Sequence, residues 1–123
     1  MTLAFWCVLV AAVLPYVPFG FASGGLNPRA PRAGANALEG LAARAYGAHL
    51  NGFEAFPFFA AAVIISHIVE GPSALVGWLA VAFVAVRIGH MAFYLSDRQP
   101  LRSACFFIAA AISVVIFIHP AFH

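Results

Sequence analysis

The chain has 123 residues, of which 64% are hydrophobic and only 8% are charged, and its formal net charge is +2. A soluble domain is usually about 45–50% apolar and about 25% charged, so this composition excludes a water-soluble globular domain. The small net charge and the lack of a basic run also give no indication of nucleic-acid binding.

The long continuous apolar runs indicate helices that cross a lipid bilayer, because a barrel would show short alternating strands. We therefore predict an all-α membrane protein, a four-transmembrane-helix bundle that forms a single domain over residues 1–123. Pro15 and Pro18 should bend the end of the first helix, and Asn36 is the expected N-cap of the second. The four predicted helices cover about residues 3–22, 36–69, 73–96 and 101–118.

The placement of arginine predicts how the chain lies in the membrane. Arg29, Arg32 and Arg44 flank the first loop, Arg98 and Arg102 flank the third, and the second loop and both tails contain no Lys or Arg. Because positive residues favour the cytoplasmic side, we expect loops one and three in the cytoplasm and both termini outside. The protein should then be an integral multi-pass protein of an inner or plasma membrane.

Polar and ionisable groups inside membrane helices are costly and usually face a cavity or each other. Asn51 and Glu54 share one face of the second helix. The third and fourth helices extend the predicted cluster, which comprises Asn51, Glu54, Arg87, His90, Tyr94, Arg102 and Ser103. Its mixture of cations, an anion and neutral donors suits a small zwitterionic or anionic molecule. Hydrogen bonding between helices and a structural Arg87–Glu54 ion pair remain open alternatives.

Four further polar residues lie at the opposite ends of the helices, and we interpret them as interfacial groups solvated near the headgroups. These are His67, Glu70, His119 and His123. Their spacing does not indicate a metal site. The sequence also contains no catalytic-triad order, phosphate loop or nucleotide fingerprint.

Residues 44–58 resemble the second-helix signature of the MAPEG family (membrane-associated proteins in eicosanoid and glutathione metabolism). The matching elements are Asn51, a Glu three residues later and a Pro three residues further. Residues 87–94 and the following Pro-Leu-Arg-Ser, residues 100–103, are similar to the family's third helix and the start of its fourth. The lysine-free composition fits a GC-rich genome, so the chain is identified as a bacterial-type member.

The resemblance implies a homotrimer that binds glutathione between neighbouring subunits, near the cytoplasmic side of the membrane. Asn51 and Glu54 would hold the glutathione backbone. The residues that would complete the pocket are Arg87, His90, Tyr94, Arg102 and Ser103. Arg102 or Ser103 would activate the thiol, because a nearby guanidinium favours the nucleophilic thiolate.

Two positions depart from the family pattern. Gly47 replaces an arginine that many active members carry, and Phe106 replaces a tyrosine of the prostaglandin-synthesising members. The first interpretation is a glutathione-dependent transferase or peroxidase-like enzyme acting on lipophilic electrophiles in contact with membrane lipid. A non-catalytic lipid- or glutathione-binding protein of the same fold is the alternative. A small multidrug transporter is a third possibility, which the uncharged first helix disfavours.

Overall fold

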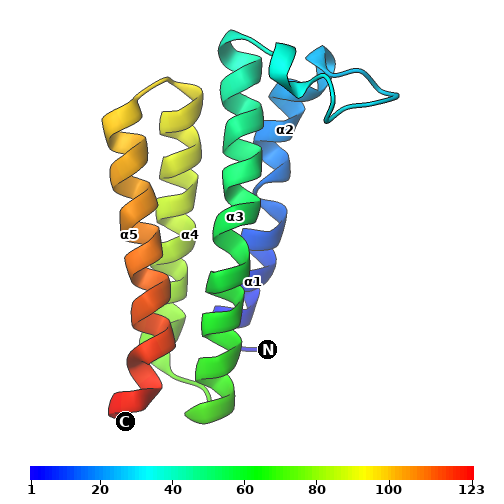
Figure 1. Cartoon of the computed structure of the whole chain (residues 1–123). Coiled ribbons are helices and arrows are strands. Elements are labelled where there is room, and N and C mark those ends of the chain that lie inside the picture. The colour runs from blue at the N-terminus through cyan, green and yellow to red at the C-terminus, as the bar shows by residue number, and fades with distance from the viewer.

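The computed structural model describes all 123 residues, and it is helical with no strands (Figure 1). Its helices are α1 (Leu3–Val13), α2 (Tyr16–Ala22), α3 (Gly40–Val69), α4 (Ala74–Leu95) and α5 (Gln99–Ile118). Three short 3-10 helices are η1 (Ser23–Gly25), η2 (Ala35–Ala37) and η3 (His119–Phe122). Four segments are long and apolar enough to cross a membrane: Leu3–Gly25, Gly40–Val69, Ala74–Leu95 and Gln99–Phe122. The protein is therefore an all-α, multi-pass membrane bundle, as the sequence predicts.

The first membrane span is interrupted between α1 and α2 at Leu14 and Pro15. Proline has no amide hydrogen, so Pro15 cannot continue the hydrogen-bond ladder of α1. The Pro15 carbonyl instead accepts a hydrogen bond from His49 Nδ1 of α3 at 2.7 Å. The predicted bend is confirmed, and the break is held against the neighbouring helix.

The predicted start of the second membrane helix at Asn36 is wrong. Asn36 lies in η2, where the Leu38 amide closes a tight turn onto the Ala35 carbonyl at 3.2 Å. Leu38 and Glu39 are extended, and α3 begins only at Gly40, whose φ of +58° glycine tolerates readily. The helix therefore begins four residues later than predicted.

The other boundaries lie within two residues of the prediction. The Ser73 hydroxyl caps α4 by accepting from the Val76 amide at 3.4 Å. Helix α5 begins at Gln99, two residues earlier than predicted, because Pro100 fits the first helical turn.

Helices α3 and α4 form the middle of the bundle, and each of them packs against both α1 and α5. The rings of Phe59 in α3 and Phe83 in α4 stack at a centroid distance of 3.8 Å, with an interplanar angle of 2°. Small side chains such as Ala4, Ala62 and Ala80 complete the core and allow the helices to approach closely. Only 23 of the 123 residues are buried, so most apolar side chains are left to face lipid.

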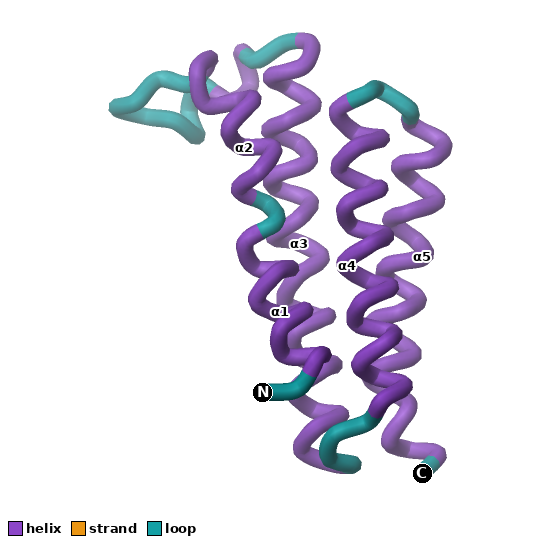
Figure 2. The backbone as a smooth tube through the Cα atoms, turned by 180° about the vertical axis from the view of Figure 1, so that it is seen from behind, coloured by secondary structure: helices purple, strands orange, loops and turns teal.

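Figures 1 and 2 show both termini and the α3–α4 turn at one end of the bundle. The first loop and the α4–α5 turn lie together at the other end. Arg29, Arg32 and Arg98 therefore gather at one end, which we call the arginine end, as the sequence predicts. Glu70 and His123 lie at the opposite end.

Candidate functional site

A polar cavity of about 260 Å³ opens between α3, α4 and α5 at the arginine end. Five of the seven predicted cluster residues line it: Asn51, His90, Tyr94, Arg102 and Ser103. Phe106 and Phe107 of α5 form its apolar wall. We call this space the Arg102 cavity, and it brings together donors from three helices that are distant in sequence.

The remaining two predicted residues line a second cavity of about 200 Å³, which we call the Glu54 cavity. Glu54, Arg87 and Ser113 are its polar residues, and Phe106 borders both cavities. Within one subunit the predicted residues thus line two neighbouring spaces. One pocket that holds all seven residues stays a prediction. Both spaces lie along the same α3–α5 face of the bundle.

Arg87 is a buried cation in the middle of the bundle, only 6% exposed. Its Nη2 donates a hydrogen bond to Asn51 Oδ1 at 2.8 Å. Arg87 forms no ion pair with Glu54. The one acid–base contact of the chain within 4.0 Å joins Glu70 to His119 at the opposite end, and this imidazole is charged only when protonated. The hydrogen bond to Asn51 thus replaces the ion pair that the sequence left open.

Two buried nitrogens of the cluster, Arg87 Nη1 and His90 Nδ1, have no hydrogen-bond partner in the chain. Leaving a buried donor or acceptor unpaired usually costs about 1–3 kcal/mol. Unpaired buried polar groups gather where a protein binds polar molecules or reacts. Ser66 Oγ of α3 is also unpaired, but it lines neither cavity, whereas His90 lines the Arg102 cavity and Arg87 the Glu54 cavity.

Tyr94 positions the other side chains of the Arg102 cavity. The guanidinium carbon of Arg102 lies 4.4 Å from the centroid of the Tyr94 ring, a cation–π contact. The His90 ring meets the same ring edge-on, with 5.7 Å between centroids and 70° between planes. The tyrosine therefore orients both the cationic group and the imidazole toward one space.

Gly47 of α3 lies directly against the phenol of Tyr94. A Cβ atom at this position would meet Tyr94 Cζ at 2.7 Å and would lie still closer to the hydroxyl oxygen. From the sequence alone, we interpreted Gly47 as the loss of a cationic side chain. In the structure Tyr94 occupies the space beside it, so a larger residue at position 47 is incompatible with this position of the tyrosine.

Arg44 lies one turn before Gly47 and does not line either cavity. Its Nε donates to the Leu95 carbonyl at 3.2 Å, at the C-terminal end of α4. A cation is favourable there because the last carbonyls of a helix lack partners. Arg44 therefore connects α3 to the C-terminal end of α4.

Sequence reasoning missed two other arrangements. His49 packs among the rings of Tyr16, Phe19, Tyr46 and Phe53 while it bonds to the α1–α2 break. At the opposite end of the bundle, Glu70, His119 and His123 converge, although their spacing gave no indication of it. In each case the convergence depends on how the helices pack, and that was not visible in the spacing.

Comparison with known proteins gives one match. The sequence model described as the MAPEG family matches residues 3–122, nearly the whole chain. No curated protein and no solved structure matches.

Proposed function

The chain belongs to the MAPEG family, and from this premise we propose a glutathione-dependent membrane transferase or peroxidase-like protein that acts on lipophilic electrophiles. The family connects the chain to glutathione and eicosanoid metabolism in general. The observation that carries the specific proposal is the Arg102 cavity, which is lined by a cation, an imidazole, a phenol and an amide from three helices and by two phenyl rings.

The groups of the two cavities match the groups of glutathione. The guanidinium of Arg102 suits a carboxylate, which it can bind through charge-assisted hydrogen bonds. Asn51 and His90 offer neutral polar contacts to peptide groups, and Glu54 offers an anion for the α-amino group. Arg87 would assist indirectly by fixing Asn51. The unpaired nitrogens of Arg87 and His90 support a polar ligand at this level of the bundle.

Arg102 and Ser103 are the proposed catalytic residues. A guanidinium beside the thiol lowers the pKa of that thiol, and a hydroxyl donor stabilises the resulting thiolate. In conjugation the sulfur forms a bond to an electrophilic carbon while the leaving group departs with its electron pair. The thiol proton passes to water. Phe106 and Phe107 would hold an apolar electrophile that arrives from the bilayer.

The exposed α3–α5 face supports a homotrimer, which the family resemblance implies. Glu54 lies halfway along α3 and is exposed in the single subunit, as are Phe58, Phe106 and Phe107. A carboxylate that faces lipid at this depth is strongly unfavourable. A neighbouring subunit would cover the carboxylate and close both cavities. We propose that lipid surrounds the remaining apolar surface of the trimer.

The arginine end is proposed to face the cytoplasm, with both termini outside an inner or plasma membrane. This follows from the positive-inside rule and from the position of the two arginine-bearing loops at one end. The Arg102 cavity would then open toward the compartment that holds most cellular glutathione.

The test compares Arg102→Ala with Arg98→Ala in purified, detergent-solubilised protein. Both remove an arginine from the same end, but Arg98 is exposed and lines neither cavity. Glutathione and a chlorodinitrobenzene serve as substrates. Loss of the guanidinium should raise the pKa of the bound thiol by about 1–2, so kcat/KM near neutral pH should fall about 10–100-fold. Arg98→Ala should retain the activity of the wild type.

The pH profile distinguishes this role from a folding defect. A cation that stabilises the thiolate acts only below the thiol pKa of the variant, so the Arg102→Ala deficit should shrink as pH rises. A deficit that stays constant across pH, or equal losses in both arginine variants, would contradict the proposal. So would an absence of turnover in the wild-type protein.

A non-catalytic binding protein is the second candidate, and the contact between Tyr94 and Gly47 favours it. Tyr94 occupies the space where many family members extend an arginine, which removes one cationic contact from the pocket. Saturable glutathione or lipid binding without turnover would identify this function. Turnover that depends on Arg102 would exclude it.

A further inference from the structure

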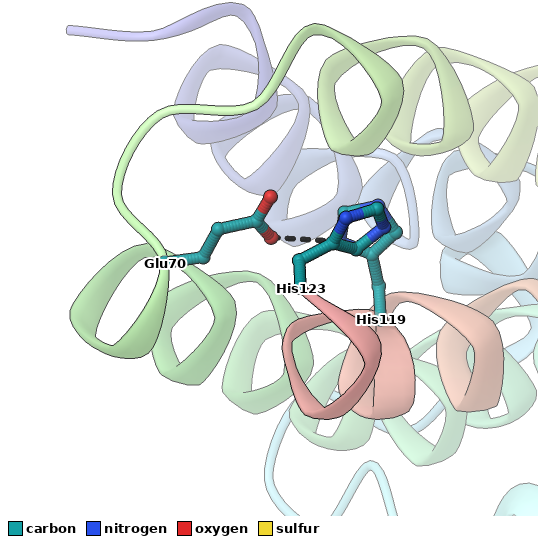
Figure 3. Close-up of side chains that lie close together, drawn as sticks. All are labelled: Glu70, His119 and His123. Atoms are coloured by element: carbon teal, nitrogen blue, oxygen red, sulfur yellow. Dashed lines mark hydrogen bonds and ion pairs between the residues drawn. The ribbon is translucent and has the colours of Figure 1, made fainter.

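A second polar cluster lies at the end of the bundle opposite the Arg102 cavity. Glu70 caps the C-terminus of α3, His119 follows the last residue of α5, and His123 follows η3. Figure 3 shows the Glu70 carboxylate turned toward the two imidazoles, which lie beside each other. Segments far apart in sequence thus deliver three metal-binding side chains to one point.

The geometry of the cluster is compact. Glu70 Oε2 lies 2.7 Å from His119 Nδ1, and the two imidazole centroids are 4.2 Å apart. One donor atom from each of the three residues lies within 4.8 Å of the others. The side chain of His119 is only 9% exposed, whereas Glu70 and His123 are exposed residues, so the cluster lies at the surface with one shielded imidazole.

The charge distribution favours a cation at this point. Every Arg of the chain lies at the arginine end or inside the bundle, and the chain contains no Lys. Glu70 therefore has no arginine or lysine partner, and the one side chain that is hydrogen-bonded to it is the imidazole of His119, which is charged only when protonated. A bound metal ion would supply the missing positive charge.

We propose that Glu70, His119 and His123 form a binding site for a divalent transition-metal ion of the Zn²⁺ class. Two imidazole nitrogens and one carboxylate oxygen are a ligand set that Zn²⁺ accepts, with water in the fourth position. Tetrahedral ligands lie about 3.3 Å apart, given Zn–N distances of about 2.0–2.1 Å. The Oε2–Nδ1 separation of 2.7 Å is shorter than this value, and the 4.8 Å limit on the ligand-atom separations is longer. Binding would therefore require the side chains to adjust around the ion.

The bound ion would fasten the end of α5 and η3 to the α3–α4 turn. Helix α3 and η3 already pack against each other, and the ion would bridge the two with direct bonds. The site is independent of the proposed glutathione chemistry, because it lies at the other end of the bundle and shares no residue with either cavity.

The test measures Zn²⁺ binding to the full chain in detergent by calorimetry, after any histidine tag has been removed. We expect saturable binding of one Zn²⁺ per chain. Loss of an outer-shell partner alone typically weakens metal affinity 10–100-fold, so His123→Ala and Glu70→Gln should each weaken it at least about tenfold. Zn²⁺ should also raise the melting temperature of the wild type and not of His123→Ala.

His67→Ala is the matched control. His67 lies at the same end of α3, but its ring contacts the Thr2 hydroxyl and the Val63 carbonyl instead of the cluster. Its removal should leave the Zn²⁺ affinity unchanged even if it lowers stability. Absence of saturable binding to the wild type would overturn the proposal. Equal affinity of the wild type and the two site variants would overturn it as well.

Discussion

Gly47→Ala tests the contact that shapes the Arg102 cavity. The added methyl group would lie 2.7 Å from Tyr94 Cζ and 3.1 Å from Cε1, closer than side chains normally approach. The tyrosine ring must therefore move away from α3. Because Arg102 stacks on the same ring, the guanidinium must either follow the ring or lose its cation–π contact.

The size of the effect follows from two opposing contributions. Added bulk in a packed site typically costs about 1–3 kcal/mol, whereas alanine is about 1 kcal/mol more favourable than glycine within a helix. Three atoms of Tyr94 obstruct the added methyl group, which places the cost near the middle of that range, at about 2 kcal/mol. We expect Gly47→Ala to reduce the free energy of unfolding by about 1 kcal/mol.

The assay is equilibrium unfolding in mixed micelles with increasing SDS, followed by the fluorescence of Trp6 and Trp78. Gly20→Ala is the control, since a Cβ there meets nothing within 4 Å, and it should gain up to about 1 kcal/mol. In a Tyr94→Ala background Gly47→Ala should also stabilise, which makes the coupling energy between the two sites about 2 kcal/mol.

The decisive result is that Gly47→Ala lowers the free energy of unfolding in the wild type and raises it in the Tyr94→Ala background. If Gly47→Ala stabilises the wild-type protein as much as Gly20→Ala does, Tyr94 does not fill the space beside Gly47. The same conclusion follows if the effect is identical with and without the tyrosine ring. The structural explanation of the departure at position 47 would then be refuted.

Two further substitutions test the middle of the bundle in the same unfolding assay. Asn51→Ala removes the acceptor of the buried Arg87 guanidinium and should cost about 2 kcal/mol, since hydrogen bonds to charged groups contribute about 1.5–3 kcal/mol. Asn51→Asp keeps an acceptor and should recover most of that loss, and equal losses in the two variants would argue against the bond. Gly52→Ala would place a methyl group 2.6 Å from Cγ of Pro15, a rigid ring, and should cost about 2–3 kcal/mol. A neutral result there would mean that α2 is not held against α3 as described.

The sequence was sufficient for the number of membrane spans and their helical type, because hydropathy and length decide which segments cross a bilayer. Pro15 also identified the bend in the first span. The start of α3 was not predictable in the same way. Asn36 is a good capping residue, but the turn that it enters stops after three residues, and the left-handed backbone of Gly40 then begins the helix.

The sequence predicted which residues line the cavities of the α3–α5 face, but not which residues line which cavity. Helical spacing places Asn51 and Glu54 on one face, yet it cannot tell which of them a given side chain of another helix reaches. In the structure Arg87 bonds to Asn51, and Phe106 borders the separate cavity of Glu54. The meeting of Glu70 with His119 depends on the relative height of α3 and α5, which no local pattern encodes.

The length of α3 has a consequence for where the chain meets water. A helix of 30 residues extends about 45 Å, whereas the hydrocarbon layer is about 30 Å thick. We expect this surplus of roughly 15 Å to lie at the N-terminal third of α3, which carries Arg44 and His49. Asn51 lies about 16 Å along α3, at the depth where the acyl chains begin. In this arrangement the Arg102 cavity would lie at the boundary between water and the acyl chains, and it would be accessible to hydrophilic molecules from the aqueous phase and to lipophilic molecules from the bilayer.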